Sequence, residues 1–164
     1  MVFCIKLLGG NILSKSVLKI GSSIMMAMAV FALVVSILWF SITEIMFVSD
    51  FLAYTGEPLS DALTQGSKSA ELFLMAKKIW GVELFAVSLL MIFIIEKSYK
   101  KGEKWSWYAL LITGCIFWGS LIGYKSVIGY FQPNISSMTF IVGAILFILG
   151  IAIPARAILG KKST

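Results

Sequence analysis

The sequence predicts an all-α membrane protein, an antiparallel four-helix transmembrane bundle with a partly helical extracytoplasmic loop between its first two helices. Of the 164 residues, 59% are hydrophobic and 13% are charged, whereas about 25% of the residues of a soluble domain are charged. Four largely apolar stretches are each long enough to cross a hydrocarbon core of about 30 Å as a helix. Lys and Arg gather on one side of these stretches. We expect one integral membrane domain over 1–164.

The first predicted span covers about 20–43 and is uncharged between Lys19 and Glu44. The segment 1–14 precedes it and lacks the apolar core and small-residue cleavage site of a secretory signal peptide. This segment is interrupted by Gly9-Gly10. We expect it to be either a short interfacial helix or a frayed tail.

The predicted extracytoplasmic loop covers about 44–71. A Thr-Gly-Glu-Pro turn at 55–58 divides it, and both halves hold apolar residues that need burial. We expect the first span to continue past the membrane interface, a short helix near 60–64 and an early start to the second span. The loop then folds onto the bundle as a cap.

The other three predicted spans follow the same logic of apolar stretches between charges. The second covers about 72–96 and is interrupted by Glu83, and the third covers about 105–124 between two lysines. The fourth covers about 135–154 and ends at Pro154, because proline does not continue a helix.

The distribution of Lys and Arg predicts the orientation, because short basic loops stay in the cytoplasm. One side of the predicted membrane holds most of them: Lys6, Lys15, Lys19, Lys97, Lys100, Lys101, Lys104, Arg156, Lys161 and Lys162. The other side holds fewer: Lys68, Lys77, Lys78 and Lys125. We expect a multi-pass protein of the cytoplasmic membrane with both termini in the cytoplasm.

Composition excludes several classes of function. The net charge is +6, but the strongly positive mean hydropathy argues against a nucleic-acid partner and for the lipid bilayer. The absence of His removes His-ligated haem, His-bearing zinc sites and His-dependent catalytic triads. Lys-assisted catalysis needs a Lys inside the bundle, and we expect none there. We therefore predict no catalytic residues, no metal, no cofactor and no enzymatic activity.

Glu83 is the sharpest candidate for function, because a carboxylate inside a span costs at least about 2.5 kcal/mol. The predicted topology brings it near a polar cluster that contains Glu44, Ser120, Tyr124 and Lys125. In one interpretation Glu83 binds a proton or a cation in an outward-opening pocket. In the other, which we favour, it is a structural carboxylate that pairs with Lys125 or a neighbouring Lys and hydrogen-bonds to Tyr124.

Glycines in the third and fourth spans predict close helix packing. Gly119 and Gly123 form a GxxxG pattern, which lets two helix backbones approach, and Gly114 extends it. We expect the partner to be the fourth span, through Gly143 and Gly150. Another subunit is the alternative.

The predicted inner loop before the third span is basic and aromatic. Lys100, Lys101 and Lys104 are suited to contact anionic headgroups, and Trp105 and Trp107 to anchor a helix at the membrane interface. We favour this membrane-interface role over a docking site for a cytosolic partner.

The string Gly-Glu-Lys-Trp-Ser-Trp-Tyr at 102–108, which opens a span after a helix that ends in basic residues, resembles a pattern in small four-helix prokaryotic membrane proteins of the DoxX-like kind. The resemblance covers about 80–129. It implies a prokaryotic inner-membrane bundle of largely unassigned function and brings no catalytic residue with it.

Three functions fit these features. We favour an accessory, assembly or structural subunit that interacts with other membrane proteins or with itself. The first alternative is a small oligomeric transporter or channel subunit that uses Glu83 for a proton or cation. The second is a lipid-binding membrane protein, which an open lateral groove would favour and a tightly filled bundle would count against.

Overall fold

The structure, a computed structural model, describes residues 2–128 and 135–160, with side chains described over 15–127 and 138–160. Its elements in chain order are α1 (Val2–Ser41), α2 (Thr43–Thr55), α3 (Leu59–Thr64), α4 (Lys68–Lys97), η1 (Tyr99–Lys101), α5 (Lys104–Ile128), α6 (Ile135–Ala152) and α7 (Ala155–Leu159). These ranges contain helices and no strand, so the predicted all-α class is confirmed.

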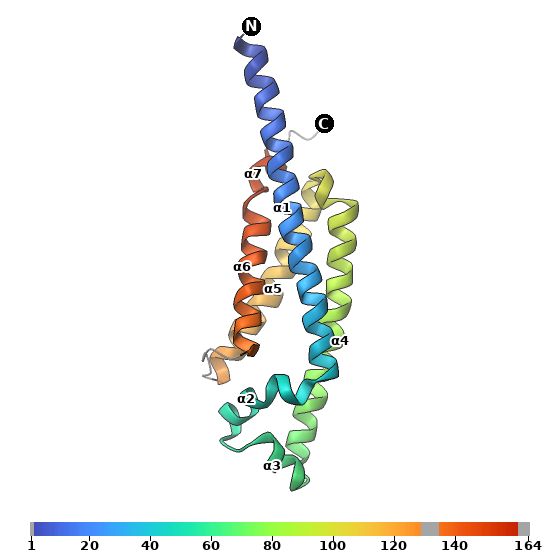
Figure 1. The fold of residues 1–164 in the computed structure, drawn as a ribbon, viewed down its shortest axis with the longest axis vertical. Helices are drawn as coiled ribbons and strands as arrows, with labels where there is room; N and C mark the ends of the chain where they lie inside the picture. Colours follow the sequence, from blue (N-terminus) through green and yellow to red (C-terminus); the bar gives the residue numbers. More distant parts are fainter. Residues whose placement is uncertain (1, 129–134, 161–164) are drawn as a thin grey trace.

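Four stretches of the described chain are helical, long and apolar enough to cross a membrane: Lys15–Ser41, Lys68–Lys101, Lys104–Val127 and Met138–Leu159. They correspond to the four predicted spans. Their helices run side by side as a bundle, with the start of α1 and α7 at one end and α2 and α3 at the other (Figure 1). The protein is thus a multi-pass helical membrane protein.

The N-terminal segment differs from both expectations. The backbone of 2–14 is the beginning of α1, and the helix runs through Gly9-Gly10 without a break. Two glycines cost a helix only about 1 kcal/mol each relative to alanine. This part of α1 extends along the bundle axis beyond the other helices (Figure 1), so it is neither an in-plane helix nor a frayed end.

The cap, which we define as α2 and α3, begins at a break that the sequence did not predict. The helix of the first span does not continue into the loop, because Ile42 leaves the helical conformation (φ −127°, ψ 43°) and α2 turns away from α1 (Figure 1). The Thr43 hydroxyl stabilises the break by donating to the carbonyl oxygen of Trp39 at 2.5 Å. The expected short helix is α3, and the expected early start of the second span is Lys68; both are confirmed.

Packing is densest where α1 lies between α4 and α6, whereas α5 is in looser contact with its neighbours. At the crossing of α1 and α4, a Cβ added to Gly81 would lie 3.1 Å from the backbone nitrogen of Phe40. The cap has a core of its own: Phe51, Leu59, Ala62, Ala70 and Leu74. This core joins α2 and α3 to the first turns of α4 and so positions the polar residues of α2.

Candidate functional site

A buried ion pair lies where the cap meets the bundle. Lys125 on α5 donates a hydrogen bond from Nζ to Oδ1 of Asp50 on α2 at 2.6 Å, and the two side chains are 4% and 0% exposed. The hydroxyl of Tyr124 donates to Oδ2 of the same carboxylate at 3.2 Å. Both oxygens of Asp50 are therefore bound by α5, and the cap is joined to a helix 75 residues further along the chain.

A second ammonium group lies beside this pair. Lys77 on α4 is 3% exposed, and its Nζ lies among four aromatic rings. The distances from Nζ to the ring centroids are 3.6 Å for Tyr124, 4.1 Å for Trp80, 4.9 Å for Phe47 and 5.2 Å for Phe73. A cation over an aromatic face is stabilised by the ring quadrupole, by about 2 kcal/mol or more when it is shielded from water. We call Asp50, Lys77, Tyr124 and Lys125 the charge cluster.

The charge cluster corrects two expectations. Lysines do lie inside the bundle, at Lys77 and Lys125. The expected pairing of Lys125 and Tyr124 with Glu83 is also wrong, because the carboxylate that binds both of them is Asp50. The structure therefore brings two of the five predicted residues together, around an acid that the prediction had placed in a loop.

The other three predicted polar residues lie elsewhere. Glu44 is exposed on α2, and Ser120 is exposed on α5 and donates its hydroxyl to the carbonyl of Phe117 at 2.8 Å. Glu83 is exposed on α4 and lines a cavity that Ser120 also lines. The predicted cluster is thus split into a buried site at the cap and a more open site within the bundle.

Sequence reasoning missed Asp50 and Lys77, although one signal pointed to Asp50. It lies three residues after Phe47 and next to Phe51, so a helix over this segment places it on the same face as apolar residues. A carboxylate on such a face needs a partner. Spacing gives a comparable signal for Lys77, because Phe73 and Trp80 lie four residues before it and three residues after it on one face of α4. The rings of Phe47 and Tyr124 come from other helices, and spacing does not reveal them.

The Glu83 cavity lies between α1, α4 and α5 and has a volume of about 310 Å³. Trp39, Trp80 and Phe117 line it, along with Ser120 and smaller apolar side chains. Its polar atoms are few, and it reaches the surface of the bundle at the exposed Glu83. A carboxylate at the edge of a cavity with an aromatic lining is suited to a cation.

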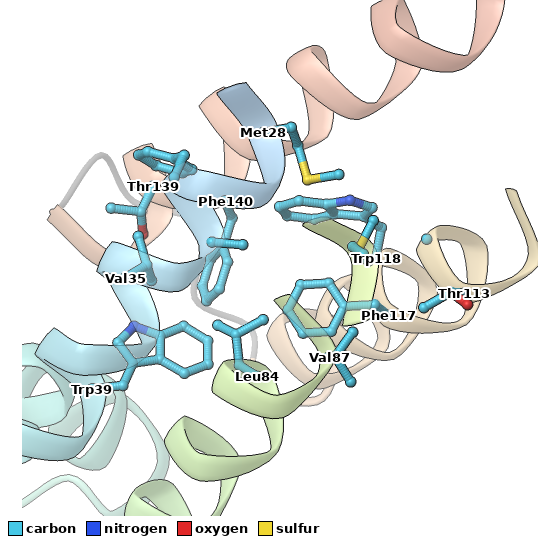
Figure 2. A pocket seen from close by; sticks show the side chains of 14 residues that line it. Met28, Val35, Trp39, Leu84, Val87, Thr113, Phe117, Trp118, Thr139 and Phe140 are labelled. Carbon is cyan, nitrogen blue, oxygen red and sulfur yellow. The ribbon is translucent and has the colours of Figure 1, made fainter. Parts of the chain in front are cut away.

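A separate cavity at the centre of the bundle is nearly filled. Its volume is about 30 Å³, and the rings of Trp39, Phe117, Trp118 and Phe140 surround it (Figure 2). This is close to the space of a single water molecule, so no acyl chain fits there. An apolar groove of about 290 Å³ opens between α5 and α6, with Lys125 among its lining residues.

The glycines fall into two groups. A Cβ on Gly114 would lie 2.0 Å from the ring of Phe147 on α6, and a Cβ on Gly143 would lie 2.4 Å from the ring of Trp118. Nothing lies within 4 Å of a Cβ on Gly119 or Gly123. The expected packing of these two glycines against the fourth span is therefore wrong, because their side of α5 faces away from the chain.

Gly150 belongs to the packed group, since a Cβ there would lie 3.2 Å from the backbone of Met25 on α1. It also takes part in a hydrogen bond at the end opposite the cap, which we call the basic end. There the hydroxyl of Tyr99 donates to the carbonyl oxygen of Gly150 at 2.7 Å. The fourth span therefore packs on α1 as well as on α5.

The predicted interface residues surround the turn between α4 and α5. Lys100 is exposed and pairs with Glu96. The exposed Trp105 donates its indole N–H to Glu103 at 2.7 Å, and this hydrogen bond lowers the pKa of Glu103 below its usual value.

Trp107 differs from the expectation of an interface anchor, because it is half-buried and donates to the carbonyl oxygen of Ile151 at 3.1 Å. Lys101 is exposed and Lys104 half-buried, and their contact with headgroups stays a prediction.

Compared with models of known protein families, with curated proteins and with solved structures, the chain has no significant match. The resemblance to DoxX-like proteins therefore stays a prediction. What the structure establishes is a multi-pass helical bundle with two distinct polar sites, the charge cluster and the Glu83 cavity.

Proposed function

We propose that this chain is a non-enzymatic accessory subunit of a prokaryotic cytoplasmic membrane that binds another membrane protein through its cap. The observation that supports the proposal is an apolar stripe on α2, made of Ile45, Val48 and Leu52. These side chains are 70%, 43% and 46% exposed.

The stripe points away from the bundle. Its three residues follow the i, i+3, i+7 spacing of one helix face. The opposite face is buried against the protein and consists of Thr43, Met46, Phe47, Asp50 and Phe51. Because α2 lies outside the four helical stretches able to span a membrane, an exposed stripe of this kind is typical of a protein interaction surface.

The charge of the cap indicates the chemistry of the partner. Glu44, Glu57 and Asp61 are exposed on or beside the cap helices. Protein interfaces commonly join an apolar centre to a polar rim of complementary charge. The partner surface we propose is therefore apolar with a basic rim.

The charge cluster supports this role by holding α2 in place. Asp50 is bound by two side chains of α5, on the face of α2 opposite the stripe. A surface that is already ordered loses less conformational entropy when it binds. The cap therefore presents its stripe in a fixed orientation.

Gentle purification from source-cell membranes tests the proposal. We expect a companion membrane protein at a constant stoichiometry, identified and quantified by mass spectrometry. The double variant Ile45→Ser/Leu52→Ser should reduce its recovery sharply. The variant Leu72→Ser is the matched control, because Leu72 is equally apolar and exposed but lies on α4, off the stripe. A solitary wild-type protein, or a companion that stays with the double variant, contradicts the proposal.

The proposed orientation has its own test. Ser60 on the cap and Lys100 at the basic end are both exposed, and each is replaced by Cys in a variant whose Cys4 and Cys115 are changed to Ser. A membrane-impermeant maleimide added to intact cells, after the outer membrane is permeabilised where one is present, should label position 60 and not position 100. The opposite pattern would place the cap in the cytoplasm.

A further inference from the structure

The Glu83 cavity supports an inference that is independent of the proposed docking role. Glu83 is the one carboxylate among the residues that line this cavity. Within the described part of the chain it forms no ion pair, although other acids on the same helix, Glu71 and Glu96, each pair with a lysine. This exposed carboxylate at the edge of the cavity is therefore available to a cation from outside the chain.

The depth of Glu83 explains why an external cation is favoured. Glu83 follows Lys77 by six residues and precedes Lys97 by fourteen, which correspond to about 9 Å and about 21 Å along α4. The hydrocarbon core is about 30 Å thick, so a core that extends from the level of Lys77 to the level of Lys97 contains the carboxylate. Ionised groups at this depth are costly without a partner, and a bound cation reduces that cost.

The lining of the cavity determines which kind of cation fits. Trp39, Trp80 and Phe117 contribute aromatic rings, which attract cations through their faces and apolar groups through dispersion. A small inorganic cation such as Ca²⁺ takes six to eight oxygen ligands. Only Glu83 and Ser120 offer side-chain oxygens here, so the cavity suits a cation that carries its own apolar substituents.

We propose that this cavity binds a monovalent lipophilic organic cation, with its charge beside Glu83 and its apolar groups against the aromatic rings. The volume of about 310 Å³ lies within the range of small-molecule sites. The same chain already holds an ammonium group among aromatic rings at Lys77. Because Glu83 is exposed at the bundle surface, the ligand enters from the membrane and not through the filled centre.

Binding of tetraphenylphosphonium to the purified protein in phosphatidylcholine nanodiscs tests the proposal. Triphenylphosphine oxide, which is neutral and similar in shape, corrects for partition into lipid. We expect saturable binding of the cation and none of the neutral compound. Glu83→Gln should weaken binding by at least about tenfold, because it removes the charge and keeps the shape. Phe117→Leu should weaken it about threefold by removing one ring.

Two control variants test whether the loss of affinity is specific to the charge of Glu83. Glu44→Gln removes an exposed carboxylate outside the cavity and should leave the affinity unchanged. Glu83→Asp keeps the charge and should retain most of the affinity, which separates loss of charge from loss of fold. Absence of saturable binding by the wild type, or equal binding by Glu83→Gln, overturns the proposal.

Discussion

The two ends of the bundle are stabilised by different interactions. At the cap end, the buried charges of Asp50 and Lys125 join α2 to α5. At the basic end, neutral donors join the turn after α4 and the start of α5 to the end of α6. These donors are the Tyr99 hydroxyl and the Trp107 indole, and their acceptors are backbone carbonyls.

The hydrogen bond at Gly150 compensates for a missing backbone donor. The carbonyl of Gly150 would normally accept from the N–H of the fourth residue after it, but that residue is Pro154, which has no N–H. Tyr99, which is fully buried, supplies the missing donor. At the basic end, a side chain thus supplies a hydrogen bond that the backbone of α6 lacks. At the cap end, charge holds separate helices together. Loss of one partner should therefore be much more damaging at the cap.

The largest effect is expected for Asp50→Ala. This change leaves the ammonium group of Lys125 buried without its carboxylate, and breaking a fully buried pair in this way costs about 3–5 kcal/mol. The free energy of unfolding, measured by SDS titration in mixed micelles with far-UV circular dichroism, should fall by that amount.

The double variant Asp50→Leu/Lys125→Met removes both charges, and so distinguishes loss of the ion pair from burial of one unpaired charge. Replacing both partners by apolar residues of similar volume is often neutral or stabilising, so most of the lost stability should return. A double variant as unstable as Asp50→Ala would show that the ion pair itself, and not the stranded charge, determines the stability of the cap end.

This asymmetry explains what the sequence revealed and what it did not. The spans were predictable because hydrocarbon selects continuous apolar runs such as the one after Lys19. The break at Ile42 was not, because no Gly or Pro marks it. The pairing of Asp50 with Lys125 depends on a tertiary contact that charge counting does not contain.

The next largest loss of stability is expected for Tyr99→Phe at the basic end. This variant keeps the ring and removes the hydroxyl, so the buried carbonyl of Gly150 loses its donor, at a cost of about 1–3 kcal/mol. The same SDS titration measures it. Leu110, also fully buried in this core, provides the control Leu110→Met, which keeps volume and should change stability less. A Tyr99→Phe variant as stable as the wild type would mean that water or another donor already satisfies the carbonyl.

Two glycines on α5 sharpen the comparison between the packed and open parts of that helix. Gly114→Ala places a Cβ against the ring of Phe147 and should destabilise by about 1–2 kcal/mol, because the overpacking outweighs the gain in helix propensity. Gly119→Ala meets open space and should be neutral or stabilising by up to about 1 kcal/mol. Equal effects of the two changes would contradict the placement of α5. A Gly119→Ala variant that is destabilised only in native membranes would point to a partner on the open side.

The smallest effect concerns an exposed hydrogen bond at the basic end. The hydrogen bond from Trp105 lowers the pKa of Glu103 in the folded protein, so its contribution to stability is present above the unfolded-state pKa and lost as the pH falls through the folded-state pKa. In Trp105→Phe, the pKa of Glu103 should rise toward its ordinary value, as followed by carboxyl carbon-13 NMR during an acid titration. Ser98 also hydrogen-bonds to Glu103, so part of the shift should remain. Because this hydrogen bond is exposed, the stability at neutral pH should hardly change, in contrast to the loss of charge at Asp50.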